Sequence, residues 1–439
     1  MPGSFDTYDD AIAWLIEHYN LERQLGGVGV DAPTLDRMRS LMGVLGDPQN
    51  SIPAIHVTGT NGKGSTSRML VELLGAIGLD AGSYSSPHIE RVNDRIAIAN
   101  QPLSDDDFAT ALAEIAAVEP FVVDAEGSPP NYFEVLCAAA YNWFAATAVD
   151  VNVIEVGVGG RWDATNVIDG EVAVITNVGA DHLEIIGPAL GDVAYEKAGI
   201  ISPDSHVVCG ETEPELVDII SAAGGREFWL RGVDFDVLGD RLAVGGRVID
   251  LFTPYGRHEE VFLPVHGAHQ ASNVAAAVAA VEAFFGRQVD DELLSGALAS
   301  LTLPARFEVM GRQPLVIVDG AHNPAGARAA AETLFGDFSS DKAPVLVVGC
   351  NRPHEPGPLL EALGAHRFGS VVATAPDWPR AVPPDEVAAA GRELGLEVQI
   401  APSVADATDS AVELAGSEGV VLIAGSLYVA SEARIHLLE

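Results

Sequence analysis

The sequence has 439 residues, of which 63 are Asp or Glu and 24 are Lys or Arg, so its formal net charge is −39. This length exceeds that of one ordinary domain and predicts at least two. Such strong acidity argues against nucleic acid or an anionic membrane as a partner, because a protein approaches either one through a basic surface.

The cysteines and the first residues indicate a compartment. The three cysteines, Cys137, Cys209 and Cys350, are scattered without metal-ligand spacing, which is typical of proteins in a reducing environment. The start of the sequence lacks a basic region followed by an apolar one, and no apolar run reaches membrane-spanning length. We therefore expect a cytoplasmic protein.

In chain order, the sequence first predicts two amphipathic helices, over residues 8–19 and 34–45, and then a strand over 55–58. Apolar, β-branched runs at 151–156 and 172–176 are typical of buried parallel strands. A helix over 133–146 precedes them. Further predictions are an antiparallel excursion within 211–262 and a helix over 269–285.

After residue 303 the alternation of strands and helices begins again. Five more strands are predicted, over 315–318, 345–348, 371–374, 398–401 and 420–424. The predicted fold class is therefore α/β: a doubly wound, mostly parallel sheet domain with a phosphate loop over residues 1–300, followed by a second, smaller Rossmann-like α/β domain over 301–439.

A glycine-rich run at residues 56–65 follows the first predicted strand and opens a helix over 65–74. Glycines let the backbone N–H groups approach an anion, and a lysine in such a loop reaches terminal phosphates. The residues expected to bind nucleotide phosphates are Gly59, Thr60, Asn61, Gly62, Lys63, Gly64 and Ser65. The spacing is shorter than in the full Walker pattern, so a plain Gly-rich turn is the alternative.

The scarcity of lysine favours the phosphate loop over that alternative. Lys63, Lys197 and Lys342 are the only lysines in a chain that otherwise uses Arg for its cations. Lys197 lies at a predicted helix end, where an ordinary role would be to complement the helix dipole. A functional role would use its primary amine, which can capture carbon dioxide as a carbamate and so become an anionic metal ligand. The spacing alone does not decide between these roles.

Polar residues also follow the predicted strands at the edge where ligands bind in parallel sheets. Glu155 ends one strand and is a candidate magnesium ligand, while Asp181 and His182 follow the next strand. The ordinary alternatives are a solvated carboxylate and a surface histidine. In the second domain, Asp319 is a candidate for ribose hydroxyls and His322 for a phosphate, and both precede a helix start at residues 323–324.

Together these motifs resemble the folylpolyglutamate synthase and dihydrofolate synthase family of the Mur ligase superfamily. The resemblance covers nearly the whole chain in order, through residues 58–65, 85–96, 132–134, 153–166, 181–182, 196–200, 269–273, 319–324 and 425–428.

The resemblance implies a set of site residues. It assigns ATP phosphates to Lys63 and its loop, magnesium to Ser86, Glu155 and His182, and a carbamylated, metal-binding lysine to Lys197. The further residues that it implies are Asn273, Arg306, Asp319 and His322 for ATP at the domain junction, and Phe133, Asp163 and Asn131 for the pterin. Lys63, Lys197, Arg306 and His322 form the implied catalytic set.

The implied activity is a bifunctional one, joining L-glutamate to dihydropteroate and to reduced folates through an acyl phosphate, with ATP and two Mg²⁺ ions, in a monomer. Alternatives are a monofunctional folylpolyglutamate synthase, a related Mur-type ligase acting on another carboxylate, and a nucleotide-binding protein without ligase activity. One segment departs from the family: residues 350–355 replace an Asp-Lys-Asp run, and Arg352 is a candidate for the missing cation.

Overall fold

Eight strands form the main sheet, in the order β4-β3-β2-β5-β1-β6-β7-β8, within the residues that the computed structural model describes, 5–23, 34–338 and 340–439. Their bounds are β1 Ala54–Thr58, β2 Ala81–Tyr84, β3 Ile96–Ile98, β4 Gln101–Pro102, β5 Val151–Glu155, β6 Val172–Ile175, β7 His206–Cys209 and β8 Glu227–Leu230. In this order, the strands β2, β5, β1, β6, β7 and β8 are parallel to one another, and β3 and β4 add an antiparallel edge. This confirms the mostly parallel sheet.

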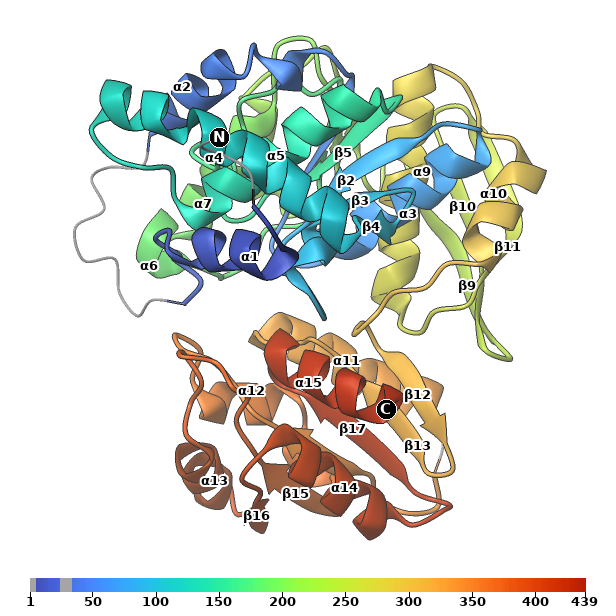
Figure 1. The fold of residues 1–439 in the computed structure, drawn as a ribbon. Coiled ribbons are helices and arrows are strands. Elements are labelled where there is room, and N and C mark those ends of the chain that lie inside the picture. Colours follow the sequence, from blue (N-terminus) through green and yellow to red (C-terminus); the bar gives the residue numbers. More distant parts are fainter. Residues whose placement is uncertain (1–4, 24–33, 339) are drawn as a thin grey trace.

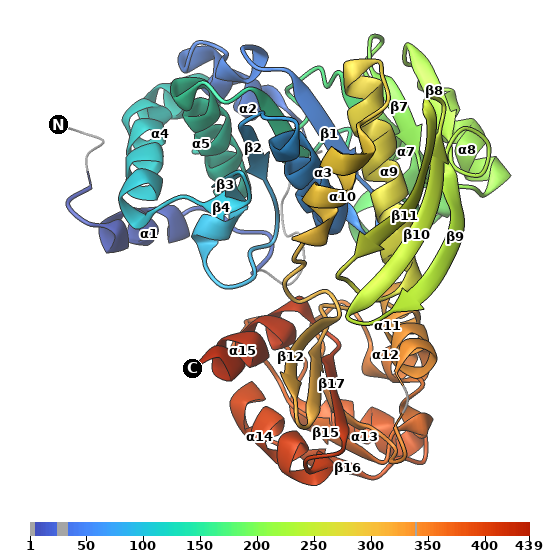
Figure 2. The same cartoon turned by 90° about the vertical axis from the view of Figure 1, so that its right-hand side faces the viewer.

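Helices cover both faces of this sheet (Figures 1 and 2). Alternate residues of β1 face different layers: Ile55 and Val57 pack with α3 (Lys63–Ala76) and α9 (Ala268–Phe285), while Ala54 packs toward the other face. The helices of that other face are α1 Tyr8–Ile16, α2 Asp36–Val44, α4 Asp105–Glu126 and α5 Tyr132–Thr147. The sheet is therefore buried on both sides, as parallel sheets require.

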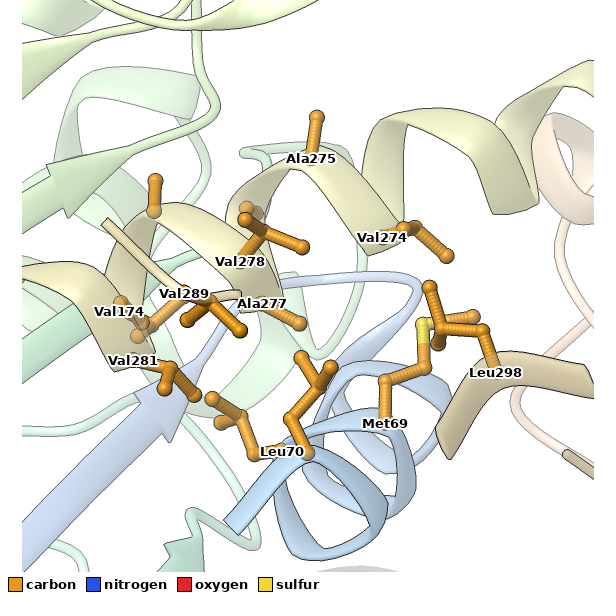
Figure 3. Close-up of a cluster of buried hydrophobic side chains, with 14 of the residues drawn as sticks. Met69, Leu70, Val174, Val274, Ala275, Ala277, Val278, Val281, Val289 and Leu298 are labelled. Atoms are coloured by element: carbon orange, nitrogen blue, oxygen red, sulfur yellow. The ribbon is translucent and has the colours of Figure 1, made fainter. Parts of the chain in front are cut away.

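Helix α9 packs closely on α3, the helix that follows the phosphate loop (Figure 3). Its buried residues are mostly alanine and valine, including Ala277, Val278 and Val281, and they meet Met69 and Leu70 of α3 in one hydrophobic core. Small side chains let helix backbones approach closely without voids. The phosphate loop is thus attached to the largest core of the molecule.

A three-stranded antiparallel sheet flanks α9, formed by β9 Asp236–Ala243, β10 Gly246–Thr253 and β11 Gly256–Leu263. It confirms the antiparallel excursion expected within 211–262. The excursion begins only at β9, because the preceding helix α8 (Pro214–Ser221) leads into β8 of the main sheet. The remaining helices before residue 300 are α6 Leu183–Ile186, α7 Leu190–Lys197 and α10 Asp291–Ala299, with short 3-10 turns at Pro48–Asn50, Val92–Arg95 and Ala198–Ile200.

A second sheet follows in the order β12-β13-β17-β14-β15-β16, and its strands are parallel except for β12. The strands are β12 Glu308–Arg312, β13 Leu315–Val318, β14 Val345–Val348, β15 Ser370–Ala373, β16 Val398–Ile400 and β17 Val420–Ala424. The helices are α11 Pro324–Asp337, α12 Pro356–Ala362, α13 Pro384–Glu393, α14 Val404–Ala415 and α15 Leu427–Leu438, with a 3-10 turn at Ala365–Arg367. This smaller body, orange to red in Figure 1, confirms the Rossmann-like α/β unit. Among the described residues, no helix combines the length and the apolar character needed to cross a bilayer.

Candidate active site between the two sheets

The glycine-rich loop after β1 has a backbone that only glycine can follow at two positions. Gly62 has a φ of +86°, and a Cβ there would lie 2.5 Å from Oδ1 of Asn273. At Gly59, a Cβ would lie 1.8 Å from Oγ1 of Thr176. No side chain in the described parts of the chain caps the N-terminus of α3, which leaves its first N–H groups without side-chain acceptors. A close backbone turn with uncapped helical N–H groups is the architecture of an anion site.

Lys63 folds back over this loop. Its Nζ donates hydrogen bonds to the carbonyl oxygens of Gly59 at 2.9 Å and Thr60 at 3.3 Å. The lysine also lines a pocket, to which the chain contributes Thr58, Gly59, Thr60, Lys63, Val156, Gly157, Val158, Gly159, Asp181, His182, Ile186 and Lys197. The structure therefore brings three separate sequence signals, the loop with Lys63, His182 and Lys197, around one space.

The loop is held by the end of β6 and by the second body. Asn61 donates its backbone N–H to Oδ1 of Asn177 at 3.0 Å, and its carbonyl accepts from Thr176 Oγ1 at 2.7 Å. Its side-chain oxygen accepts from Nδ2 of Asn323 at 3.0 Å, across 262 residues of sequence. Asn61 thus links the segment that follows β6 of the main sheet to the N-terminus of α11 in the second body. Sequence reasoning treated Asn323 only as a helix start, which it also is, because it caps α11.

Glu155 ends β5 beside the loop and is only 4% exposed. Its carboxylate accepts from the backbone N–H of Ser86 at 3.4 Å, and a Cβ at Gly64 would lie 3.4 Å away. Burial raises the pKa of Glu155 to about 7, against the charges of Lys63 and Arg306, which lower it. No salt bridge pairs Glu155 with a cation in the described structure. A buried carboxylate of this kind is stabilised by a cation bound beside it.

Lys197 is the second lysine of the pocket and is buried. It ends α7 and is 4% exposed. Burial, helped by the charge on Lys63, lowers the pKa of Lys197 to about 7. A large fraction of this lysine is therefore the neutral amine near neutral pH, which is the form that reacts as a nucleophile.

Asp181 meets three histidines where the two bodies face each other. Its carboxylate oxygens lie 3.8 Å from His182 Nε2, 3.9 Å from His322 Nε2 and 3.8 Å from His354 Nε2. Although burial favours the neutral acid, the neighbouring imidazoles of His322, His182 and His354 hold the pKa of Asp181 well below its usual range. His322 Nδ1 donates to the carbonyl of Gly320 at 3.0 Å, because a carbonyl only accepts. We call Asp181, His182, His322 and His354 the junction cluster.

The turn between the two bodies is held by Asp319. Its two carboxylate oxygens accept the backbone N–H groups of Phe307 and Ala321, both at 2.8 Å. Ala305 and Phe307 have φ values of +54° and +50°, an uncommon conformation that persists only where the surroundings fix it. Arg306 lies between them, and its Nη1 donates to the carbonyl of Ala305 at 3.1 Å. Asp319 therefore fixes the backbone that carries Arg306.

The three residues expected at the pterin occupy two kinds of position. Phe133 and Asp163 are neighbours, since a Cβ at Gly157 would lie 2.7 Å from the Phe133 ring and 3.1 Å from Asp163 Oδ2. Asp163 is buried and accepts from Oγ1 of Thr165 at 2.6 Å, and burial raises its pKa. Asn131 instead caps α5, where its side-chain oxygen accepts from the N–H of Glu134 at 2.9 Å.

Segment 350–355, which departs from the family pattern, directs Arg352 to the surface and His354 to the junction. Arg352 forms a salt bridge with Glu386 at 2.5 Å and has a side chain that is 43% exposed. His354, which sequence reasoning did not single out, is the residue that reaches the junction cluster. Its only sequence signal was its position six residues after the end of β14.

Comparison with known proteins agrees with this geometry. Residues 57–281 match the Mur ligase middle domain, and residues 305–427 match the Mur ligase glutamate ligase domain. The dihydrofolate synthase/folylpolyglutamate synthase of Mycobacterium tuberculosis is 37% identical over 98% of this chain and 95% of its own length. That of Bacillus subtilis is 31% identical over 99% of this chain and 100% of its own.

Solved structures agree as well. Mycobacterium tuberculosis folylpolyglutamate synthase complexed with ADP superposes with a TM-score of 0.91 at 36% identity, covering 98% of both chains. The Escherichia coli protein FolC in complex with DHPP and ADP gives a TM-score of 0.84 at 29% identity, again over 98% of both chains. Similarity of this extent, across both sheets and the junction between them, is similarity of the whole architecture. The chain belongs to the folylpolyglutamate synthase/dihydrofolate synthase family of the Mur ligases.

Proposed function

We propose that this protein is a bifunctional dihydrofolate synthase and folylpolyglutamate synthase, which uses ATP to join L-glutamate to dihydropteroate and to reduced folates. One observation carries the proposal. The phosphate loop with Lys63, the buried Lys197 and the second body's His322 all meet at one junction. A protein that only bound nucleotide would have no need for this convergence, and whole-length relatives bear these enzyme names.

The residues present fit a nucleotide and magnesium. Glycines at positions 59 and 62 leave a cradle that a Cβ would fill, beside the uncapped N-terminus of α3. The described residues hold no group of three His, Cys, Asp or Glu side chains placed for a metal. A magnesium ion at Glu155 and His182 would therefore complete its shell with Ser86, phosphate oxygens and water. Bound there, it would neutralise phosphate charge.

The chemistry needs charge neutralisation more than proton transfer. A substrate carboxylate attacks the γ-phosphate of ATP, ADP leaves, and an acyl phosphate forms. The amine of L-glutamate then attacks the acyl carbon and releases phosphate. In the first step two anions approach each other, and Lys63 and Arg306 supply positive charge from opposite sides of the junction. Closure of the second body over the loop excludes the water that would hydrolyse the acyl phosphate.

Finer parts of the proposal rest on the family resemblance. Asn273, Arg306, Asp319 and His322 would bind the nucleotide, with Phe133, Asp163 and Asn131 at the pterin. A carbamate on Lys197 would bind a second magnesium. The domains would span residues 1–300 and 301–439, in a cytoplasmic monomer that binds neither nucleic acid nor membrane.

The experiment is phosphate release from ATP and Mg²⁺ with L-glutamate, with dihydropteroate and tetrahydrofolate supplied separately, and with product masses recorded. Release with both pterins, matched by the mass gain of one glutamyl unit, supports the bifunctional ligase. Release with tetrahydrofolate alone would leave a folylpolyglutamate synthase, the name borne by a Lacticaseibacillus casei relative that is 34% identical. Release with neither would overturn the proposal.

A further inference from the structure

The segment between β14 and α12 is held in one conformation by several backbone contacts. The N–H of Arg352 donates to the carbonyl of Arg380 at 2.8 Å, and the N–H of Val382 donates to the carbonyl of Cys350 at 2.9 Å. A tight turn follows, in which the N–H of His354 donates to the carbonyl of Asn351 at 3.1 Å. The side chain of Asn351 donates to Oγ of Ser426, the cap of α15, at 3.0 Å. The segment that carries residue 354 is therefore fixed to the loop that follows β15 and to the N-terminus of α15.

This fixed backbone directs His354 across the junction. Its Nε2 lies 3.8 Å from Oδ1 of Asp181, and its ring centroid lies 5.6 Å from that of His322. Asp181 lines the same pocket as Lys63 and Lys197. The ring, which the smaller body contributes, thus lies beside Asp181, a residue that lines the pocket.

The ring nitrogens of His354 are not used by the protein itself. A separation of 3.8 Å from Asp181 is too long for a direct hydrogen bond, and in the described structure neither ring nitrogen has a closer partner. The side chain is 23% exposed, and neither ring nitrogen is among the buried unpartnered polar atoms of the described residues, so both can be reached from solvent. Ring nitrogens that have no protein partner and lie beside an anion site are open to a ligand.

We propose that His354 binds an anionic ligand group at the junction, donating a hydrogen bond either to a terminal phosphate of the nucleotide or to a carboxylate of the incoming amino acid. The inference rests on the proposed function for the identity of these ligands. Both groups present oxygens that accept from an imidazole N–H, and both must reach the space between Lys63 and the second body. Arg352, in the same segment, instead forms a salt bridge with Glu386 and is exposed to solvent.

The test compares His354→Ala with Arg352→Ala, which changes the same loop outside the pocket. Steady-state kinetics give kcat and separate KM values for ATP and L-glutamate. Calorimetry gives the affinities for magnesium AMPPCP and for L-glutamate without turnover. Loss of a hydrogen bond to a charged group predicts at least about a tenfold weaker binding of one of the two ligands in His354→Ala. Arg352→Ala should stay within about twofold of the parent, since an exposed ion pair contributes little.

The two affinity measurements distinguish a nucleotide phosphate from an amino-acid carboxylate as the group that His354 binds. Weaker AMPPCP binding with unchanged glutamate binding assigns His354 to the phosphate, and the reverse assigns it to the amino acid. His354→Lys, which restores a donor, should recover at least part of the lost affinity. Unchanged affinities and KM values in His354→Ala would overturn the inference, as would equal losses in His354→Ala and Arg352→Ala. A parent that binds both ligands but does not ligate would instead count against the proposed function alone.

Discussion

Two groups of histidines and carboxylates in this molecule differ in how completely they are paired. At the edge of the core, His258 is fully buried and donates or accepts at both ring nitrogens, 3.0 Å from the buried Glu282 and 2.6 Å from Asp291, whose side chain is exposed. Glu282 also accepts from Thr253 and from the N–H of Val289. We call these residues the core cluster. In the junction cluster, the corresponding distances to Asp181 are 3.8 to 3.9 Å.

This difference in pairing predicts different roles for the core cluster and the junction cluster. A buried polar network in which every group is satisfied fixes one packing arrangement of the elements that carry it. A network left open by about 1 Å at the rim of a pocket has unused donors and acceptors, which a ligand can take. The core cluster is thus expected to affect stability, and the junction cluster with its pocket to affect activity.

The largest effect should follow Lys197→Ala, in the pocket next to the junction cluster. We expect ligation to fall at least about 100-fold, because the site loses the residue proposed to carry the carbamate. The melting temperature should change little, since burial of the Lys197 amine is unfavourable and its removal relieves that desolvation. Lys342→Ala, at an exposed lysine, is the control and should retain activity. Full activity in Lys197→Ala would refute the carbamate assignment.

The second effect should follow Glu282→Ala in the core cluster. This change leaves His258 and the Val289 N–H buried without their acceptor, so the free energy of unfolding should fall by about 3–5 kcal/mol. Urea denaturation measures it. Glu292→Ala, on the exposed face of α10, should stay within about 0.5 kcal/mol of the parent. The KM values for ATP and glutamate should not change, and altered KM values would break the contrast between the clusters.

The smallest effect concerns pH and the core cluster. Burial alone would lower the pKa of His258, but its hydrogen bonds to Glu282 and Asp291 outweigh burial and raise it. A raised pKa in the folded state means that the contribution to stability is complete below about pH 6.5 and is lost as pH rises through the folded-state value. Unfolding measured at several pH values above about 6.5 should therefore show a decline that His258→Gln lacks. An identical pH profile in the variant would contradict this.

Most of the fold could be predicted from the sequence, because its central strands are strongly apolar. The strands β13, β14 and β17 begin and end where the apolar runs do, since buried parallel strands need such runs. Strand β2 reads Ala-Gly-Ser-Tyr and gave no comparable signal. It is a strand because β5 and β3 pair with it on both sides, a tertiary effect that local propensity does not contain.

The candidate site could be predicted only where local signals exist. The glycine spacing and the scarcity of lysine singled out Lys63 and Lys197, and the structure places both at one pocket. The contacts of Asn323 with Asn61 and of His354 with Asp181 join residues on different sheets. Such pairs depend on how the two bodies meet, so no local pattern marks them. The roles of the predicted site residues stay predictions.

The alanine-rich contact between α3 and α9 has a consequence for timing. Opening a gap of one methyl group in such an interface costs about 1 kcal/mol, so α3 and the phosphate loop stay fixed on the main sheet. His322, His354 and Asn323 belong to the smaller body, outside this interface. We therefore predict that the nucleotide cradle is in place before the smaller body closes on it, and that this closure precedes each turnover.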